Sequence, residues 1–174
     1  MATIDSLLSG GDPRSLGKAE LVVRLVLQDP SLTGELFECL FVEDETIRMR
    51  ASDAFEKVCR VSPSLIEPYL DRLLVEGAQV PQASVQWHIA QIIGEVPLTE
   101  PQRAEAVRLL QRNLERQTDW IVLNYSLESL ARLAREDRSF QEYLVVQLKR
   151  LSVSRLKSVS KRAKKLLREF EGPD

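Results

Sequence analysis

The pattern of apolar residues is clearest in the stretch Thr118–Arg135, where they recur at helical spacing. At 100° per residue, the apolar side chains fall on one broad arc, formed by Trp120, Val122, Leu123, Leu127, Leu130, Leu133 and Ala134. A surface helix buries a stripe of roughly 100°, whereas this arc covers about 200°. We therefore expect a helix with neighbours on several sides, and we expect Trp120 to lie in the core.

The same periodicity predicts helices along most of the chain. The expected helices span residues 16–28, 32–42, 46–61, 64–76, 82–96, 99–116, 118–135, 137–151 and 154–170. Residues 1–14 hold a short apolar patch and a Gly-Gly turn, which predicts a flexible N-terminal arm. No alternating pattern of β-strand length is present. The sequence therefore predicts an all-α fold with a single domain over residues 15–171.

The expected helices recur at a regular spacing. Ile47 aligns with Val85 after 38 residues, and Val85 aligns with Val122 and Val159 after two further steps of 37 residues. Around each of these positions the same apolar template returns. A period in the high thirties with two helices per unit indicates an α-solenoid, in which each helix pair stacks on the next. A non-repetitive helical bundle is the alternative architecture.

Two segments carry a family resemblance. The segment 45–55 (ETIRMRASDAF) resembles the second helix of a HEAT repeat, in which an acidic turn precedes Val-Arg and two spaced alanines. The segment 68–74 resembles the first helix, with its proline and its leucine run, and the resemblance extends over residues 31–171. Other residues stand at the position of Arg48 in the later units, namely Gln86, Leu123 and Ser160. The resemblance implies a right-handed α-solenoid of about four HEAT-like helix pairs plus an N-terminal capping helix.

The resemblance also implies where a partner binds, because the second helices of HEAT-like arrays line a concave face. The solvent-facing positions of those helices form a ladder of candidate partner-binding residues: Arg50, Trp87, His88, Asn124, Tyr125, Glu128, Lys161, Arg162 and Lys165. Trp87 and Tyr125 stand near its middle, and aromatic residues are enriched at binding hot spots. The alternative interpretation is that both rings cover seams between helices.

Charge is unevenly distributed along a chain whose net charge is only −2. Between Lys149 and Arg168 the sequence has nine Lys or Arg and no Asp or Glu. The rest of the chain has the other 15 of the 24 basic residues and all 26 acidic ones, so it is strongly negative. In the last expected helix the basic residues repeat at spacings of three and four: Lys157, Lys161, Lys164, Lys165 and Arg168. Such a helix binds nucleic-acid backbone, a membrane surface or an acidic partner, or simply keeps the end of an array hydrated.

Other features narrow the function classes. With 44% apolar and 29% charged residues, the composition is that of a globular protein. The chain shows neither a signal-peptide pattern nor an apolar run of transmembrane length, so we expect no membrane span and a cytoplasmic location.

Cys39 and Cys59 stand in apolar helical patterns and are expected to be buried thiols. Two cysteines and one histidine offer no metal-ligand spacing, and we expect no cofactor.

The sequence supports one main function hypothesis and two alternatives. The main hypothesis is a non-catalytic scaffold that binds a protein or peptide partner on the concave face of a short HEAT-repeat array. The first alternative is binding of nucleic-acid phosphates through the basic last helix and groove, as in HEAT-like DNA-repair proteins, although no glycosylase motif matches residue by residue. The second is an enzyme that uses His88 as a general base beside Asp53 or Glu128. Because no catalytic motif accompanies His88, we expect the protein not to be an enzyme.

Overall fold

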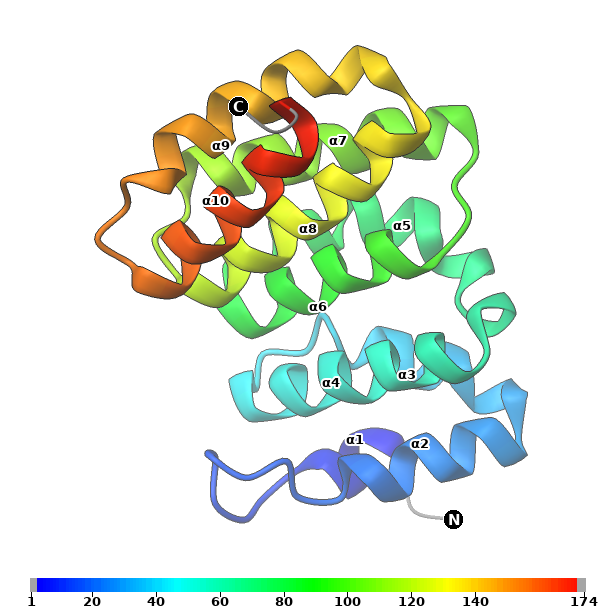
Figure 1. Ribbon diagram of the computed structural model, residues 1–174. Helices are drawn as coiled ribbons and strands as arrows, with labels where there is room; N and C mark the ends of the chain where they lie inside the picture. The colour runs from blue at the N-terminus through cyan, green and yellow to red at the C-terminus, as the bar shows by residue number, and fades with distance from the viewer. Residues whose placement is uncertain (1–2, 172–174) are drawn as a thin grey trace. The chain divides into compact units, whose positions relative to one another are not determined.

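The computed structural model describes residues 3–171, and all regular structure in this range is helical (Figure 1). No strand occurs among these residues, which confirms the predicted all-α class. Contacts between Cα atoms group the chain into two compact units, one within Met1–Leu98 and the other within Thr99–Asp174. Within residues 3–171, no helix combines the length and the hydropathy that a bilayer crossing requires.

The first unit is a set of packed helices joined by short turns. Its described helices are α1 (Ile4–Leu8), α2 (Ala19–Gln28), α3 (Thr33–Glu38), α4 (Glu45–Val61), α5 (Leu70–Val75) and α6 (Ala83–Glu95). Single 3₁₀ turns lie between them at Pro30–Leu32, Pro63–Leu65, Glu67–Tyr69 and Gly77–Gln79. Helix α4 is central in this unit, because it packs against α2 and against α6 (Figure 1).

Local signals define where α4 begins and ends. The carboxylate of Asp44 accepts hydrogen bonds from the backbone N–H groups of Thr46 and Ile47, at 2.7 and 3.1 Å. The helix ends just before Pro63, which has no N–H to donate. Between these ends Phe55 is fully buried, and its ring centroid lies 5.5 Å from that of Phe37 on α3. Burying one such ring stabilises a fold by about 1.5–3 kcal/mol, so α4 contributes strongly to the core of this unit.

The second unit is built around α8. Its described helices are α7 (Glu100–Arg116), α8 (Trp120–Glu136), α9 (Gln141–Ser152) and α10 (Lys157–Glu171), with a 3₁₀ turn at Arg138–Phe140. Helix α8 contacts α7, α9 and α10, as its broad apolar arc predicts, and Leu127 and Leu130 are completely buried. Trp120 does not follow this prediction, because half of its surface is exposed. It is the first residue of α8 and lies at the end of the helix, where neighbouring helices cover it only in part.

Side-chain caps set the starts of α7 and α8. Thr99 and Gln102 form a capping box: the N–H of Gln102 donates to Thr99 Oγ1 at 3.4 Å, and the N–H of Thr99 donates to Gln102 Oε1 at 3.0 Å. Asp119 caps α8 by accepting hydrogen bonds from the backbone N–H groups of Ile121 and Val122, at 2.8 and 3.1 Å. These caps explain why the predicted starts of both helices lie so close to the observed ones.

The N-terminal segment differs from the predicted flexible arm. Residues 4–8 form α1, in which Ile4 and Leu8 are buried, with 2% and 0% of their surface exposed. The loop that follows is held by Arg50 of α4, whose guanidinium donates four hydrogen bonds of 2.6–2.8 Å to backbone carbonyl oxygens, those of Leu8, Gly10, Asp12 and Ser15. Residues 1–2 of the predicted arm lie outside the described range.

Some helices begin later than periodicity alone predicts. The segment predicted as a helix over 64–76 opens with 3₁₀ turns, and α5 starts only at Leu70. Pro63 and Pro68 lie in these turns, where their missing N–H groups remove helix hydrogen bonds. At the start of the helix predicted over 137–151, the side chain of Asp137 accepts a hydrogen bond from the N–H of Ser139 and holds a 3₁₀ turn instead.

Candidate binding groove between helices α8 and α10

Arg50, predicted to face a partner, is buried instead, with 1% of its surface exposed. Its guanidinium donors are taken by the carbonyl oxygens of the N-terminal loop, so they are not offered to a partner. The prediction of Arg50 as an exposed contact residue is therefore corrected. The repeat alignment placed it on an outward face of α4, but residues 9–17 cover that face with a loop that has no apolar periodicity of its own.

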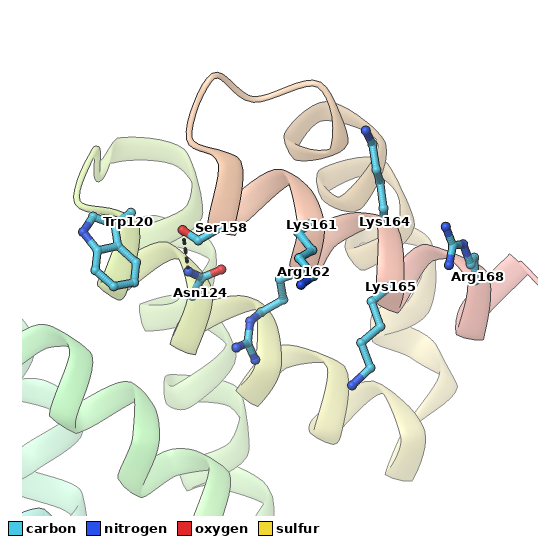
Figure 2. Close-up of a pocket in the computed structure, with 8 residues that line it drawn as sticks. All are labelled: Trp120, Asn124, Ser158, Lys161, Arg162, Lys164, Lys165 and Arg168. Atoms are coloured by element: carbon cyan, nitrogen blue, oxygen red, sulfur yellow. Dashed lines mark hydrogen bonds between the residues drawn. The ribbon is translucent and has the colours of Figure 1, made fainter.

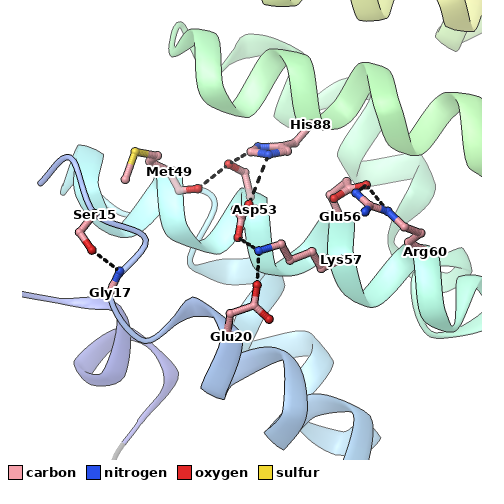
Figure 3. Close-up of polar contacts among 10 residues, drawn as sticks. Ser15, Gly17, Glu20, Met49, Asp53, Glu56, Lys57, Arg60 and His88 are labelled. Carbon is pink, nitrogen blue, oxygen red and sulfur yellow. Dashed lines mark hydrogen bonds and ion pairs between the residues drawn. The ribbon is translucent and has the colours of Figure 1, made fainter.

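His88 is also buried, and it belongs to a polar network between α4 and α6 (Figure 3). Its Nδ1 lies 3.0 Å from Ser52 Oγ, and its Nε2 lies 3.9 Å from Asp53 Oδ1. The other oxygen of Asp53 lies 3.0 Å from Lys57 Nζ, as an ion pair without good hydrogen-bond geometry. Burial lowers the pKa of His88 to about 4, and the positive charges of Lys57 and Arg60 act in the same direction. The imidazole is therefore neutral at pH 7.

The network of Ser52, His88 and Asp53 has the residue types of a catalytic triad, but its geometry favours a structural role. Ser52 and His88 expose only 2% and 7% of their surface, so a substrate has no path to either. The Ser52 hydroxyl donates to the carbonyl of Met49 at 2.9 Å. A general base works best with a pKa near the working pH, whereas that of His88 is lowered to about 4. We interpret the network as a polar link that holds α4 against α6.

The cysteines behave as predicted. Cys39 and Cys59 are buried free thiols, with 3% and 0% of their surface exposed. Burial raises the pKa of each thiol to about 12, so both stay protonated and unreactive at neutral pH. Among residues 3–171, no group of three or more His, Cys, Asp or Glu side chains is arranged to hold a metal ion.

In the second unit a hollow of about 610 Å³ lies between α8 and α10 (Figure 2), and we call it the α8–α10 groove. It is lined by two side chains of α8 and six of α10: Trp120, Asn124, Ser158, Lys161, Arg162, Lys164, Lys165 and Arg168. The structure thus brings four predicted partner-binding residues together, namely Asn124, Lys161, Arg162 and Lys165. Basic side chains dominate the α10 wall of this groove.

The remaining predicted residues lie at its edge or elsewhere. Glu128 of α8 pairs with Arg162, with 2.8 Å between Oε2 and Nη1, and so borders the groove. Tyr125 is half-buried and does not line it. Trp87 belongs to the first unit, where it is also half-buried and its ring centroid lies 5.2 Å from that of His88. The two aromatic residues predicted at the middle of the ladder are therefore not part of the α8–α10 groove.

Helix α10 shows its basic face to solvent because its apolar face is used in packing. Val159, Ala163 and Leu166 are buried, and α10 contacts both α8 and α9. Near its start, Asn124 Nδ2 donates a hydrogen bond of 3.3 Å to Ser158 Oγ and links α10 to α8. The apolar residues repeat at three- and four-residue spacing, so the lysines between them must point away from the core.

Most cations that line the groove have no ion-pair partner. Arg162 pairs with Glu128, whereas four others have no carboxylate within ion-pair distance among the described residues, namely Lys161, Lys164, Lys165 and Arg168. The acidic residues of α10 have other partners. Arg135 holds the carboxylate of Glu169 at 2.6 Å, which lowers the pKa of that carboxyl, and Lys149 holds Glu171 at 2.6 Å. The groove is therefore a site of uncompensated positive charge.

Two neutral groups complete the groove. Half of the Trp120 surface is exposed, although tryptophan is a large apolar residue that cores usually bury. Asn124 is 7% exposed, and its Oδ1 is buried without a hydrogen-bond partner in the described structure. Asn124 therefore belongs to the packed wall between α8 and α10, whereas Trp120 offers apolar surface that a ligand can reach.

Sequence reasoning did not select Trp120 or Ser158 as site residues. Trp120 belongs to the apolar arc of its helix, and nothing in the arc shows that this first residue is left half exposed. Lys164 and Arg168 belong to the predicted basic helix but not to the predicted ladder. These side chains line one hollow from two helices, α8 and α10, so only the packing of the two helices identifies them together.

The sequence matches no protein-family model, and a comparison with curated proteins finds no match. Among solved structures, the chain is similar to the crystal structure of an engineered protein from a structural genomics programme, with a TM-score of 0.65 and 18% identity. The alignment covers 97% of this chain and 78% of the engineered protein. At this identity the similarity concerns the fold alone, and it agrees with the all-α class.

Proposed function

We propose that this chain is a non-catalytic binding module, a short HEAT-like α-solenoid that engages a protein or peptide partner. The spacing of 37 and 38 residues and the HEAT-like segment 45–55 support the solenoid. The contacts of α4 with both α2 and α6 are of the kind that stacked helix pairs make. The buried free thiols of Cys39 and Cys59 suit a reducing compartment, which supports a cytoplasmic location.

The α8–α10 groove is the observation that carries the proposal. It combines an exposed aromatic ring with unpaired cations, on two helices that pack against one another. Tryptophan and arginine are among the side chains that contribute most binding energy at protein interfaces, and lysines add electrostatic attraction. The groove is open to solvent along α10, as a surface that receives a chain segment must be.

Binding of nucleic acid is the second candidate function, and the unpaired cations of α10 favour it. A basic groove beside an aromatic ring is the arrangement with which many proteins hold single strands. It ranks second because single-strand binders stack successive bases on several aromatic side chains, whereas among the described lining residues of this groove Trp120 alone is aromatic.

Photo-crosslinking in cells tests the proposal directly. We expect p-benzoylphenylalanine in place of Trp120 to form a discrete protein adduct on illumination, because the ring stands at the mouth of the groove. The same photoreactive residue in place of Val75 is the matched control, since Val75 is 54% exposed but lies on α5 of the first unit. The adduct should disappear in the double variant Lys161→Glu/Lys165→Glu. A nuclease-sensitive adduct, or no adduct specific to position 120, contradicts the proposal.

A further inference from the structure

We propose that the α8–α10 groove recognises an acidic segment of polypeptide that carries an aromatic or large apolar residue beside its carboxylates. This inference rests on the proposed function and adds the chemistry of the partner. Two features of the groove support it, namely the row of cations on α10 and the exposed ring of Trp120.

The cations define the charge and the length of the ligand. Lys161, Lys164, Lys165 and Arg168 line the groove, and none has a carboxylate partner among the described residues. A rise of 1.5 Å per residue places the two ends of this row about 10 Å apart along α10. An extended polypeptide covers that distance in about three residues, so the row accommodates two or three carboxylates on neighbouring or alternate residues.

Trp120 gives the groove an apolar end. Its indole is half exposed and lies on the same hollow as Asn124 and Lys161. An aromatic or large apolar side chain that covers the ring removes apolar surface of both partners from water, at roughly 25 cal/mol per Å². Acidic residues alone would leave this surface uncovered.

The charge of the rest of the chain favours a short acidic segment over a long polyanion. Residues 1–98 carry 8 basic and 15 acidic residues, whereas residues 99–174 carry 16 and 11. The positive charge is therefore local to the second unit, and the chain as a whole has a net charge of −2. A short segment with a few carboxylates needs only this local charge, whereas a long polyanion needs a positive surface of greater length.

Selection from a displayed library of random 12-residue peptides tests the inference without assuming a sequence. With the full chain as bait at 50 mM salt, we expect enriched peptides to contain several Asp or Glu and at least one aromatic or large apolar residue. The Lys161→Glu/Lys165→Glu variant should lose this enrichment. Lys18→Glu is the matched control, because Lys18 is exposed in the first unit, and it should keep the enrichment.

Titration of one enriched peptide then measures each contribution by fluorescence anisotropy. We expect affinity to fall at least tenfold when its Asp and Glu are replaced by Asn and Gln. We expect a loss of at least threefold with Trp120→Ser, and a steep loss between 50 and 300 mM salt. Circular dichroism of each variant confirms that the helices remain folded.

The possible outcomes separate the inference from the proposed function. The inference is wrong if the enriched peptides are neutral or basic. It is also wrong if the peptide with Asn and Gln in place of Asp and Glu binds as tightly as the acidic one. In both cases peptide binding itself stands. The absence of any enriched peptide also overturns the inference, and the crosslink at position 120 then decides the proposed function separately. A 12-nucleotide single-stranded DNA that binds more tightly than the best acidic peptide overturns both.

Discussion

At the scale of single residues, the buried polar side chains of the first unit are used inside the fold. Arg50 is 1% exposed and donates only to backbone carbonyls, and His88 is 7% exposed and contacts Ser52. Removing one partner of a buried hydrogen bond costs about 1–3 kcal/mol, because the other group loses both water and protein contacts. These residues therefore affect stability, whereas the exposed lysines of α10 are available for binding.

The titration of His88 is testable because it is the only histidine in the chain. Its pKa is about 4 in the folded protein and close to 6.5 in an unfolded chain. Between these values the unfolded state binds a proton that the folded state does not, so stability falls as pH falls from 6.5 to 4. The expected loss reaches up to about 3 kcal/mol.

Urea unfolding of the wild type and of His88→Asn between pH 7 and pH 4 measures this effect. The variant is less stable at pH 7 because it loses the contact with Ser52. The difference between the two proteins should shrink steadily as the pH falls, since only the wild type loses the histidine contribution. Carboxyl groups far from His88 titrate in both proteins and cancel in the comparison. If the free energies of unfolding of the two proteins differ by the same amount at every pH, the assigned burial of His88 is wrong.

At the scale of elements, the loop between α1 and α2 is held by one side chain of α4. The loop contains Gly10 and Gly17, with φ of +68° and +53°, in the left-handed region that other residues rarely adopt. A Cβ atom on Gly17 meets the Arg50 guanidinium carbon at 3.0 Å, whereas one on Gly10 meets nothing within 4 Å. The two glycines therefore share a backbone conformation but differ in their surroundings.

This difference predicts the outcome of two matched substitutions. Gly10→Ala costs only the left-handed strain, about 1–2 kcal/mol. Gly17→Ala adds displacement of a guanidinium that four hydrogen bonds hold in place, and we expect it to cost at least 1 kcal/mol more by urea unfolding. In an Arg50→Ala background the two glycine variants should become equally destabilising. A difference that persists without Arg50 indicates that the clash is elsewhere.

At the scale of the whole molecule, the chain contains two compact units, each with its own buried core. When contacts are mainly local, a change in one part loosens its neighbours first, and stability is distributed unevenly along the chain. The N-terminal loop contacts α4, while α8 and α10 belong to the second unit. A substitution that disturbs the loop should therefore destabilise the helices of the first unit more than those of the second.

Hydrogen exchange of Gly17→Ala measured by mass spectrometry tests this expectation. Under native conditions at pH 7, amides of α1, α2 and α4 should exchange at least tenfold faster than in the wild type, because Arg50 no longer holds the loop in place. Amides of α8 and α10 should keep their protection. An equal acceleration in all helices indicates that the chain opens as one cooperative unit and contradicts the expectation.

Most of the helices can be predicted from the sequence, because the buried residues of each helix recur with a period of about 3.6 residues. The capping residues Thr99 and Asp119 then place the starts of α7 and α8 to within a residue or two. The basic face of α10 can also be predicted from the sequence, because its apolar residues lie on one side of the helix and its lysines therefore lie on the other. These features depend only on residues close together in the chain.

The burial of individual polar residues cannot be predicted in the same way, because it depends on elements that are distant in the sequence. Arg50 is covered by a loop about 40 residues earlier, joined to it through hydrogen bonds such as that to Gly10. Trp120 is half exposed because it is the first residue of α8 and neighbouring helices cover it only in part, although Val122 and Leu123 close to it are buried. The α8–α10 groove likewise forms only where two helices pack. Hydrophobic periodicity is a property of one helix, whereas a binding site is a property of the space between helices, and only folded packing defines that space.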